Sequence, residues 1–288
     1  MKNLNSSKLI STVLVICSFA FGYFVIGNPR IVQPVVKVIA QAIALGYGSC
    51  PYGSGEYGNL NCNNAVTSTS LNLKVLLSGN FVDSSDTMTT SLQLANIIPT
   101  AQPYSAAPYL YSGTESATAF ATDVVDWVLV EVKNSTGATV AKKAGLLKSN
   151  GSVVDSTASA TTLSLPSVTT TGDYKVIVRH RNHLAIATDS NATLTTNAIS
   201  TIDLTQNINV RGQNQLKVGT NSSSQDLYAM RMANISSDDT VDSLDRTLSK
   251  NAVESLNVYD KADVNLDGTV DSLDRTLSSL AQEALENI

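Results

Sequence analysis

The chain is poor in the residues that most enzymes use for catalysis. Its 288 residues include two histidines and one tryptophan, and only 15% of them are charged. Few side chains are therefore available for general acid–base chemistry, and the sequence contains no glycine-rich phosphate-binding loop. We expect a protein that is not an enzyme. One tryptophan and scattered tyrosines also offer little stacking surface for sugars, so a carbohydrate-binding β-sandwich is a less favoured alternative.

The chain also lacks a basic cluster that could follow a nucleic-acid backbone, so no nucleic-acid partner is expected. The net charge is −5, yet residues 234–288 alone contain twelve acidic and four basic side chains. The excess of negative charge is concentrated in this tail. The tail is therefore predicted to bind cations.

The N-terminus carries two apolar runs. Lys2 and Lys8 precede the first run, Leu9 to Gly27, which has the pattern of an export signal and is also long enough to span a bilayer. A second run follows at 31–46. We expect an exported protein, at the cell surface or extracellular, with residues 1–44 either cleaved as a signal peptide or kept as a hydrophobic membrane anchor. Contact with a membrane is expected only through this segment.

The chain has three cysteines. Cys17 lies in the first apolar run, while Cys50 and Cys62 lie in a Gly- and Tyr-rich linker, 45–66. In an oxidising compartment a disulfide between Cys50 and Cys62 would hold this flexible loop. Metal binding by the pair is the weaker alternative, because the spacing differs from that of a zinc knuckle and no histidine is near.

Residues 67–210 have the pattern of a β-sandwich. Short runs rich in valine and threonine are separated by turn sequences, without a helical period between them. The strands are expected at 71–77, 124–132, 138–147, 173–180, 191–196 and 198–205. Such spacing predicts two packed antiparallel sheets with Trp127 in the core. Three prolines between residues 82 and 116 indicate a surface excursion, and 211–233 is expected to be a linker.

The ten residues TVDSLDRTLS occur twice, at 240–249 and 269–278. The second copy belongs to a twelve-residue loop, 263–274, with oxygen-bearing side chains at alternate positions, a glycine at the sixth position and a carboxylate at the end. Calcium prefers such hard oxygen ligands around a sharp turn. The predicted calcium ligands of this second loop are Asp263, Asn265, Asp267, Thr269, Asp271 and Asp274.

The corresponding first loop, 234–245, has fewer acidic positions. Its predicted ligands are Asn234, Ser236, Asp238, Thr240, Asp242 and Asp245. Asp239 stands where the second loop has glycine, at a position that requires a positive φ. We therefore expect the first loop to bind calcium more weakly than the second. We also expect calcium to drive the folding of residues 234–288, since the ion would neutralise their crowded carboxylates.

Each loop leads into an amphipathic helix. Apolar residues recur at helical spacing in both: Leu244, Leu248 and Ala252 in the first, and Leu273, Leu277, Leu280 and Ala281 in the second. We expect these two apolar stripes to pack on each other with near two-fold symmetry.

In both loops the twelfth position is an aspartate preceded by Ser-Leu. With this feature the repeat resembles a type I dockerin rather than an ordinary EF-hand. The resemblance implies the calcium roles given above. It also implies a cohesin-contacting role for Ser243, Leu244, Ser272 and Leu273. The fold expected from sequence is therefore mainly β: an antiparallel β-sandwich followed by a small α-helical, dockerin-like calcium module.

Three further segments resemble a β-sandwich unit of large secreted bacterial surface proteins, where a paired calcium-loop module follows it. They are VVDWVLVEV at 124–132, AGLLKSNGSVVD at 144–155 and GDYKVIVRHRNHLAIAT at 172–188. This resemblance implies an exported, non-catalytic surface role.

The motif RHRNH contains the remaining candidate site residues, Arg179, His180, Arg181 and His183. Two histidines three residues apart invite a metal ion. On a strand, however, they would face opposite sides unless a turn begins at Asn182, and the two arginines repel cations. We expect a hydrogen-bonded network that holds a turn, with an anionic or glycan ligand as the alternative.

Three functions remain open from sequence. The main expectation is a structural or adhesive protein of the cell surface, which would bind other surface proteins or copies of itself, including in a filament. The alternative is a dockerin that attaches the chain to a cohesin-bearing scaffold in polysaccharide degradation. The third is the carbohydrate-binding β-sandwich.

Overall fold

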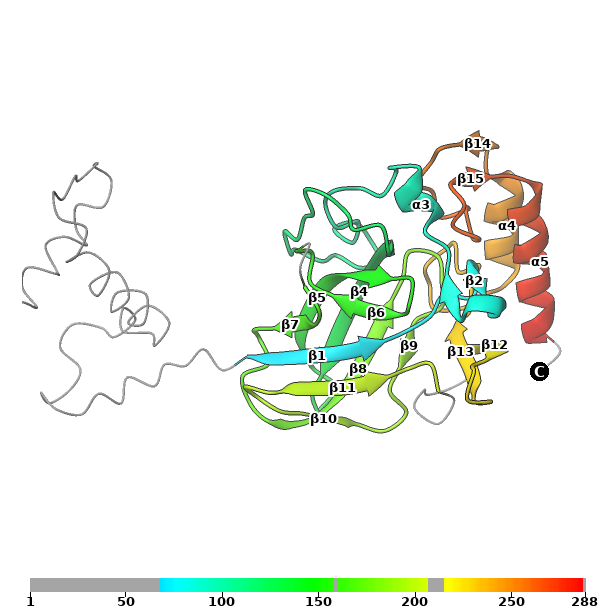
Figure 1. Ribbon diagram of the computed structural model, residues 1–288. Coiled ribbons are helices and arrows are strands. Elements are labelled where there is room, and N and C mark those ends of the chain that lie inside the picture. The colour runs from blue at the N-terminus through cyan, green and yellow to red at the C-terminus, as the bar shows by residue number, and fades with distance from the viewer. Residues whose placement is uncertain (1–67, 158–159, 207–214, 287–288) are drawn as a thin grey trace, which may run out of the picture. The chain divides into compact units, whose positions relative to one another are not determined.

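The computed structural model describes residues 68–157, 160–206 and 215–286 (Figure 1). They belong to one compact unit, Val66–Ile288. The β body and the tail, which the sequence divides into separate domains, therefore fold as one unit. The predicted signal or anchor segment and the predicted Cys50–Cys62 disulfide lie outside the described residues.

The main sheet has nine strands. They are β1 (Thr69–Lys74), β4 (Val124–Lys133), β5 (Thr139–Lys148), β6 (Ser152–Val154), β7 (Leu163–Leu165), β8 (Gly172–Arg179), β9 (Ile186–Ala187), β10 (Ala192–Leu194) and β11 (Ile199–Asp203). The longer of these coincide with the strands expected from sequence. The predicted mainly-β architecture is confirmed.

Shorter elements complete the chain. They are β2 (Phe81–Val82), the 3-10 helix η1 (Asp83–Ser85), β3 (Thr87–Met88), α3 (Ser91–Leu94), β12 (Gln215–Thr220), β13 (Asp226–Met230), α4 (Ser243–Asn251), β14 (Ser255–Leu256), β15 (Thr269–Val270) and α5 (Ser272–Glu286). Among the described residues, no helix is long and apolar enough to cross a membrane.

Hydrogen bonding connects the main sheet in the order β10-β8-β4-β5-β6-β1-β11, with β7 also paired to β1 and β9 to β8. All these pairs are antiparallel except β1 with β11, which run parallel. The two ends of this order, β10 and β11, follow each other in sequence and contact each other. The sheet therefore curls back around its core, where two separate sheets were expected.

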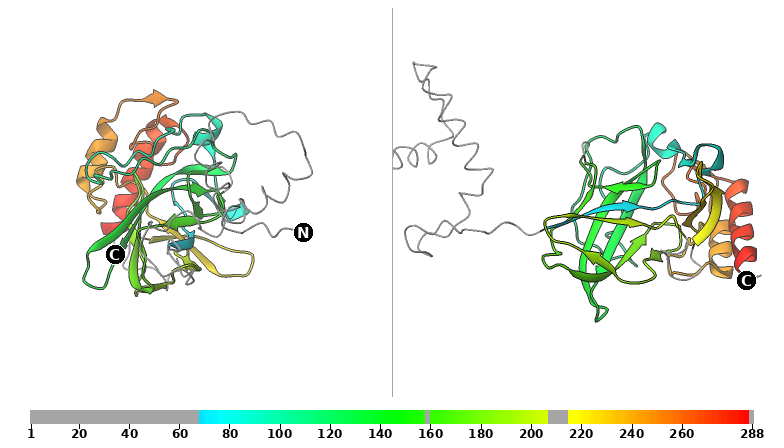
Figure 2. Two further views of the ribbon diagram at one scale, coloured as in Figure 1. Left: turned by 90° about the vertical axis from the view of Figure 1, so that its left-hand side faces the viewer. Right: turned by 60° about the horizontal axis from the view of Figure 1, so that its bottom comes forward.

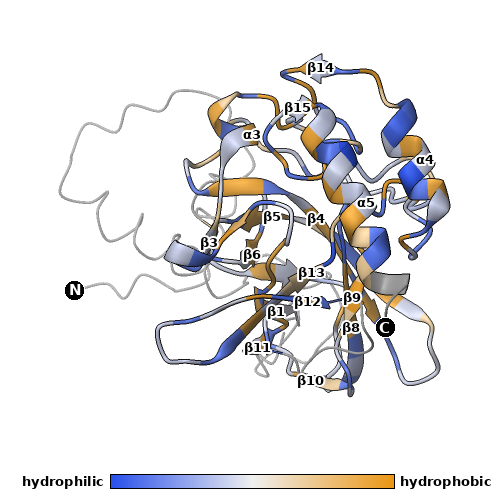
Figure 3. Cartoon of the chain, turned by 90° about the vertical axis from the view of Figure 1, so that its right-hand side faces the viewer, coloured by the Kyte–Doolittle hydropathy of each residue, from blue (hydrophilic) through white to orange (hydrophobic). Residues whose placement is uncertain are grey.

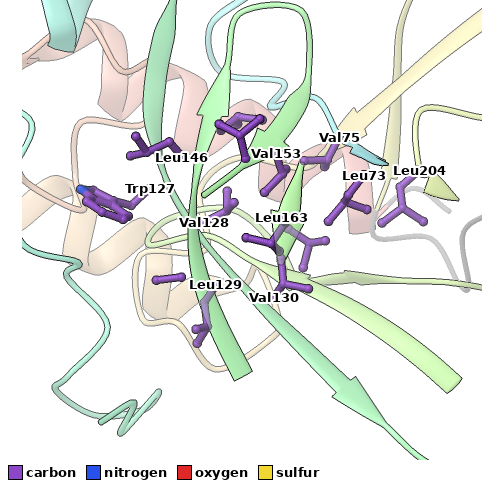
Figure 4. Packing of buried hydrophobic residues seen from close by; sticks show 14 of the residues in the cluster. Leu73, Val75, Trp127, Val128, Leu129, Val130, Leu146, Val153, Leu163 and Leu204 are labelled. Carbon is purple, nitrogen blue, oxygen red and sulfur yellow. The ribbon is translucent and has the colours of Figure 1, made fainter. Parts of the chain in front are cut away.

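Strand β4 is buried along nearly its whole length. Val128 and Val130 point toward Leu163 in the core, while Trp127 lies on the other side of the strand (Figure 4). Two packed faces explain why the sequence VVDWVLVEV is almost continuously apolar. In β8, by contrast, buried residues alternate with half-exposed ones, as expected for a strand with one covered face.

The second face of β4 is covered by the segment that was expected to be a surface excursion. Trp127 donates from its indole nitrogen to the Pro99 carbonyl at 2.8 Å, and the Tyr104 hydroxyl donates to the Trp127 carbonyl at 2.6 Å. Tyr104 is fully buried. The expectation was wrong in this respect, because the aromatic residues between the prolines pack onto the sheet.

A β-hairpin, β12–β13, lies in the segment expected to be a linker. Met230 forms a parallel bridge with Leu77, and its amide donates to the Leu76 carbonyl at 2.8 Å. The hairpin therefore continues from the end of β1 and brings the chain to the tail helices, which lie side by side at this end of the body (Figure 2).

Gly151 turns the chain between β5 and β6 and offers a test of this packing. It has φ +88°, and an added Cβ would lie 2.8 Å from the Val75 carbonyl oxygen. Gly151→Ala should lower the free energy of unfolding by about 2 kcal/mol or more, from backbone strain plus this clash. Gly137→Ala is the control, since φ is +82° there but nothing lies within 4 Å. Gly137→Ala should lower the free energy of unfolding by about 1 kcal/mol. Equal losses in urea unfolding would contradict this packing.

Candidate metal and docking site

The two predicted loops have the same internal hydrogen bonds. The carboxylate at the twelfth position is buried in both loops, as Asp245 and Asp274. Asp245 accepts from the amides of Ser236 and Asp242 at 2.8 and 2.9 Å. Asp274 accepts from the equivalent amides of Asn265 and Asp271 at 3.4 and 2.9 Å. The repeated sequence thus builds a repeated structure.

The ninth position begins each helix. Asp242 accepts from the Leu244 amide, and Asp271 accepts from the Leu273 amide, each at 2.7 Å. In α4 this bond forms a capping box with Asp245. The fifth position repeats as well, since Asp238 and Asp267 accept from the threonine amides two residues later.

The loops differ at their first and sixth positions. In the second loop Asp263 accepts from the amides of Asp267 and Gly268, each at 3.1 Å, and Gly268 has φ +86°. In the first loop the neutral Asn234 stands in place of Asp263. Asp239, in place of the glycine, adopts φ +68°, as expected for that position.

The second loop contains buried negative charge. Asp263 is fully buried, and burial raises its pKa to about 7, with repulsion from Asp274 and Asp267 adding to the effect and Arg181 opposing it. Burial also raises the pKa of Asp274. A divalent cation would relieve this unfavourable charge, and the oxygen-rich side chains of the loop suit calcium.

In the part of the chain that the structure describes, no group of three or more His, Cys, Asp or Glu side chains is gathered in a metal-binding arrangement. The loop carboxylates instead accept hydrogen bonds from backbone amides. Each loop thus contains side chains of the types that suit calcium at the expected positions. Hydrogen bonds from backbone amides to its carboxylates already hold the loop in its turn.

The motif RHRNH forms the junction between the β body and both loops. Strand β8 ends at Arg179, and the chain turns so that the Nδ1 atoms of His180 and His183 lie 3.0 Å apart. His180 Nε2 lies 3.1 Å from Asp126, and His183 Nε2 accepts from the Gly79 amide at 3.3 Å. Burial lowers the pKa of both histidines, so both are neutral near pH 7.

Arg181 is the centre of this junction. It is 4% exposed, and its Nε donates to Asp126 Oδ2 at 3.0 Å. Its other nitrogens donate to the Asp260 carbonyl and approach Asp263 Oδ2 to 3.8 Å, while the guanidinium covers the Tyr259 ring. Burial alone would raise the pKa of Asp126, but Arg181 and His180 lower it to about 2. One buried cation therefore joins β4 to the second loop.

Neighbouring residues of the motif complete the attachment. Asn182 donates to the carbonyls of Lys261 and Asp263 at 3.0 and 2.6 Å. On the first loop, Arg179 forms a two-bond ion pair with Asp239 at 2.9 and 3.0 Å. The geometry is that of the hydrogen-bonded network expected from sequence, with the first and second loops as its partners.

Sequence reasoning missed Asp126, Asn182 and Tyr259. The signal for Asp126 was available, because a carboxylate inside the apolar run VVDWVLVEV needs a buried partner. Its hydroxyl partner Tyr259, at 2.6 Å, comes from a segment between the repeats that has no distinctive pattern.

The faces of the two helices differ from the prediction. α4 and α5 contact each other, but Leu244, Leu273 and Leu280 are 49%, 50% and 54% exposed. Their buried faces contain polar side chains, Asp245 and Ser249 in α4 and Asp274 and Ser278 in α5. The expectation that the leucine stripes pack on each other was therefore wrong. The carboxylate that closes each loop points inward, while the leucine one position earlier, about 100° around the helix axis, is half exposed.

Hydrophobic and hydrophilic residues alternate along α4 and α5 (Figure 3). Ser243, Leu244, Ser272 and Leu273, the predicted partner-contacting residues, are all exposed. Beside α5 lies an apolar groove of about 170 Å³, lined in part by Leu216, Met232, Leu277 and Leu280. We call the exposed leucines of α4 and α5 (Leu244, Leu248, Leu273 and Leu280) the leucine face.

No protein-family model matches this chain, and no curated protein matches it. Two solved structures are similar to it, both interface mutants of the type II cohesin–X-dockerin complex from Acetivibrio cellulolyticus. The C-terminal interface mutant has 15% identity and a TM-score of 0.35, with 74% of this chain and 95% of that chain covered. The N-terminal interface mutant has 17% identity and a TM-score of 0.33, with 75% and 93% covered.

Substitutions at two arginines test the junction. Arg181→Met leaves Asp126 buried without its cation, so the free energy of unfolding should fall by about 3–5 kcal/mol. Arg275→Met is the control, because its partner Glu254 is largely exposed, and the loss should be about 1 kcal/mol or less. Both values come from urea unfolding followed by tryptophan fluorescence. Similar losses in the two variants would show that the Arg181 junction does not dominate.

Proposed function

We propose that this chain is an exported, non-catalytic protein of cell-surface assembly, in which the β body carries a calcium-stabilised loop–helix pair that docks a protein partner. The leucine face is the observation that carries this proposal. Leu244 and Leu273 occupy the same position in the two repeats, and both are about half exposed. Apolar side chains that recur on an outer surface are typical of interaction sites.

The inward positions of the loop-closing carboxylates support the proposal. If the leucines served to hold the helices together, they would face inward, as the 3.6-residue period allows. Loop-closing carboxylates and serines take that inward position instead. The leucine face therefore remains available to a partner, with Ser243 and Ser272 next to it to supply hydrogen bonds.

Calcium has a structural role in this proposal. Asp263, Asn265, Asp267, Asp271, Asp274 and the Thr269 carbonyl would hold the ion in the second loop. The ion would supply positive charge to the buried carboxylates and thereby keep both helices in position. In the first loop Asp239 is already paired with Arg179, and Asn234 contributes no charge. That loop is accordingly the weaker calcium site.

The N-terminal sequence pattern supports export, and the resemblance of the repeats to type I dockerins makes cohesins the first partners to test. Other surface proteins, including a second copy of this chain, are the alternative partners for the leucine face. Both histidines of the chain take part in the buried network at the junction, with each other and with Asp126. This structural use supports a non-catalytic role.

Calcium dependence is tested by removing the ion and by a matched pair of substitutions. Chelation should lower the melting temperature by roughly 10 °C, since calcium at a thousandfold excess over its Kd adds about 4 kcal/mol. Asp267→Ala should weaken calcium binding about tenfold or more in titration calorimetry, because a charged ligand is lost. Asp238→Ala, the same position in the first loop, should weaken it less. An unchanged melting temperature after chelation would contradict the proposal.

Docking is tested with immobilised type I and type II cohesins in millimolar calcium. The wild type should bind at least one of them, and the double variant Leu244→Asp/Leu273→Asp should bind about 30-fold more weakly or worse, because two central apolar contacts become charged. Leu94→Asp is the control, since Leu94 is 76% exposed on α3 outside the pair. It should bind like the wild type. Equal binding by the double variant would contradict a role for the leucine face.

A further inference from the structure

A lysine and two carboxylates meet on the β body, outside the loop–helix pair. Lys143 lies in the middle of β5, Asp155 directly follows β6, and Glu115 comes from the segment that covers β4. The Lys143 Nζ atom is 3.3 Å from Glu115 Oε1 and 3.8 Å from Asp155 Oδ1. The side chain of Lys143 is 24% exposed, that of Glu115 11% and that of Asp155 25%. This Lys–Asp–Glu cluster is largely withdrawn from water.

The cluster is poorly satisfied as a set of ion pairs. Glu115 Oε2 and Asp155 Oδ1 are both buried, and neither has a hydrogen-bond partner. Buried carboxylate oxygens normally find one, because leaving such an atom unpaired is costly. Asp155 Oδ1 lies near the Lys143 nitrogen but beyond hydrogen-bond distance. The lysine nitrogen therefore lies 3.8 Å from the Asp155 carboxylate without a hydrogen bond to it.

The surroundings hold the two carboxylates in place. The Tyr111 hydroxyl donates to Glu115 Oε1 at 2.7 Å, and the Ser164 amide donates to Asp155 Oδ2 at 3.2 Å. Gly113 leaves room for the Glu115 carboxylate, since an added Cβ there would lie 2.4 Å from Oε2. Positioned reactants of this kind need little further ordering to react.

The surroundings make the Asp155 carboxylate easier to protonate than it is in water. Burial raises its pKa, and the nearby negative charge of Glu115 adds to the effect, while Lys143 and the Ser164 amide oppose it. An acid is a better acceptor for an amine than a carboxylate is, because its hydroxyl can leave as water. Glu115, in contact with the lysine nitrogen, is placed to move protons between the two groups.

We propose that Lys143 and Asp155 form an intramolecular amide bond between Lys143 Nζ and Asp155 Cγ, with Glu115 as the proton-transfer group. Glu115 first relays one proton from the ammonium to the Asp155 carboxylate, which gives a neutral amine and a neutral acid. The nitrogen then attacks Cγ and forms the N–C bond. Glu115 carries a second proton from the nitrogen to one hydroxyl of the tetrahedral intermediate, the C–O bond breaks, and water leaves.

The reaction balances without any other reactant. Of the three protons on the ammonium, one stays in the amide and two leave with the oxygen, so one positive and one negative charge disappear together. Nothing is oxidised or reduced. The product links β5 covalently to the chain that follows β6. A cross-link of this kind stabilises a fold mainly by restricting its unfolded chain.

Intact-mass spectrometry of the purified, reduced full chain tests this bond. The wild type should weigh one water molecule less than its sequence requires. Lys143→Arg should restore the full mass while keeping the positive charge between Glu115 and Asp155, and Asp155→Ala should do the same. Lys142→Arg is the matched control, because Lys142 is the neighbouring lysine and donates to the Tyr109 carbonyl. This variant should keep the loss of water.

Two further measurements define the bond and the role of Glu115. Tryptic digestion should give a linked pair of peptides, 143–148 joined to 149–175, with no cleavage after Lys143. Glu115→Gln should form the link at least tenfold more slowly, as measured by the fraction linked over time after refolding. Circular dichroism will confirm that each variant folds. Lys143→Arg should also melt several degrees lower than Lys142→Arg.

Two results would overturn the proposal. One is a folded wild type with its full mass and normal cleavage after Lys143, which would leave the cluster as an ion pair. The other is a loss of water that persists in Lys143→Arg, which would place the dehydration elsewhere, for example at Asp267–Gly268. Both results are independent of the calcium and cohesin experiments, so the docking role and the amide bond can fail separately.

Discussion

The buried contact between Arg181 and Asp126 is the interaction on which the arrangement of this protein depends. Asp126 lies inside the central strand β4, where an unpaired carboxylate would strongly destabilise the fold. Arg181 neutralises it and in the same position reaches the Asp260 carbonyl and the edge of the second loop. This cation therefore joins body and tail, because it neutralises Asp126 of the body and also contacts Asp260 and Asp263 of the tail.

The same constraint accounts for the different fates of the two repeats. The second loop keeps an aspartate at its first position and a glycine at its turn, the features that suit an ion. The first loop has replaced both, and its Asp239 contacts Arg179 of the body instead. Both copies therefore contact the body, while the second also keeps the acidic oxygen set. The leucines, which neither task uses, remain on the outer surface.

Much of this could be predicted from the sequence where a short-range pattern determines the structure. The alternation in β8, the near-continuous apolar run of β4 and the positive φ at Asp239 all follow from local rules. The helix faces could not be predicted in this way, because the period of the leucines does not show which face the loop carboxylate needs. The curl of the sheet and the pairing of Asp126 with Arg181 depend on contacts between distant segments. Asp126 gave a partial signal as a charge in an apolar strand, but nothing local identified its partner.

The contacts of Asn182 and Arg181 with the second loop make the tail dependent on the β body. Asn182 holds the backbone on either side of Ala262, and Arg181 stands beside the first carboxylate of the loop. Residues 234–288 are therefore not expected to form an independent module. Transplanted onto an unrelated carrier, they would lose the support that the β body supplies to Asp263, and a useful fusion tag would have to include strands β4 and β8 as well.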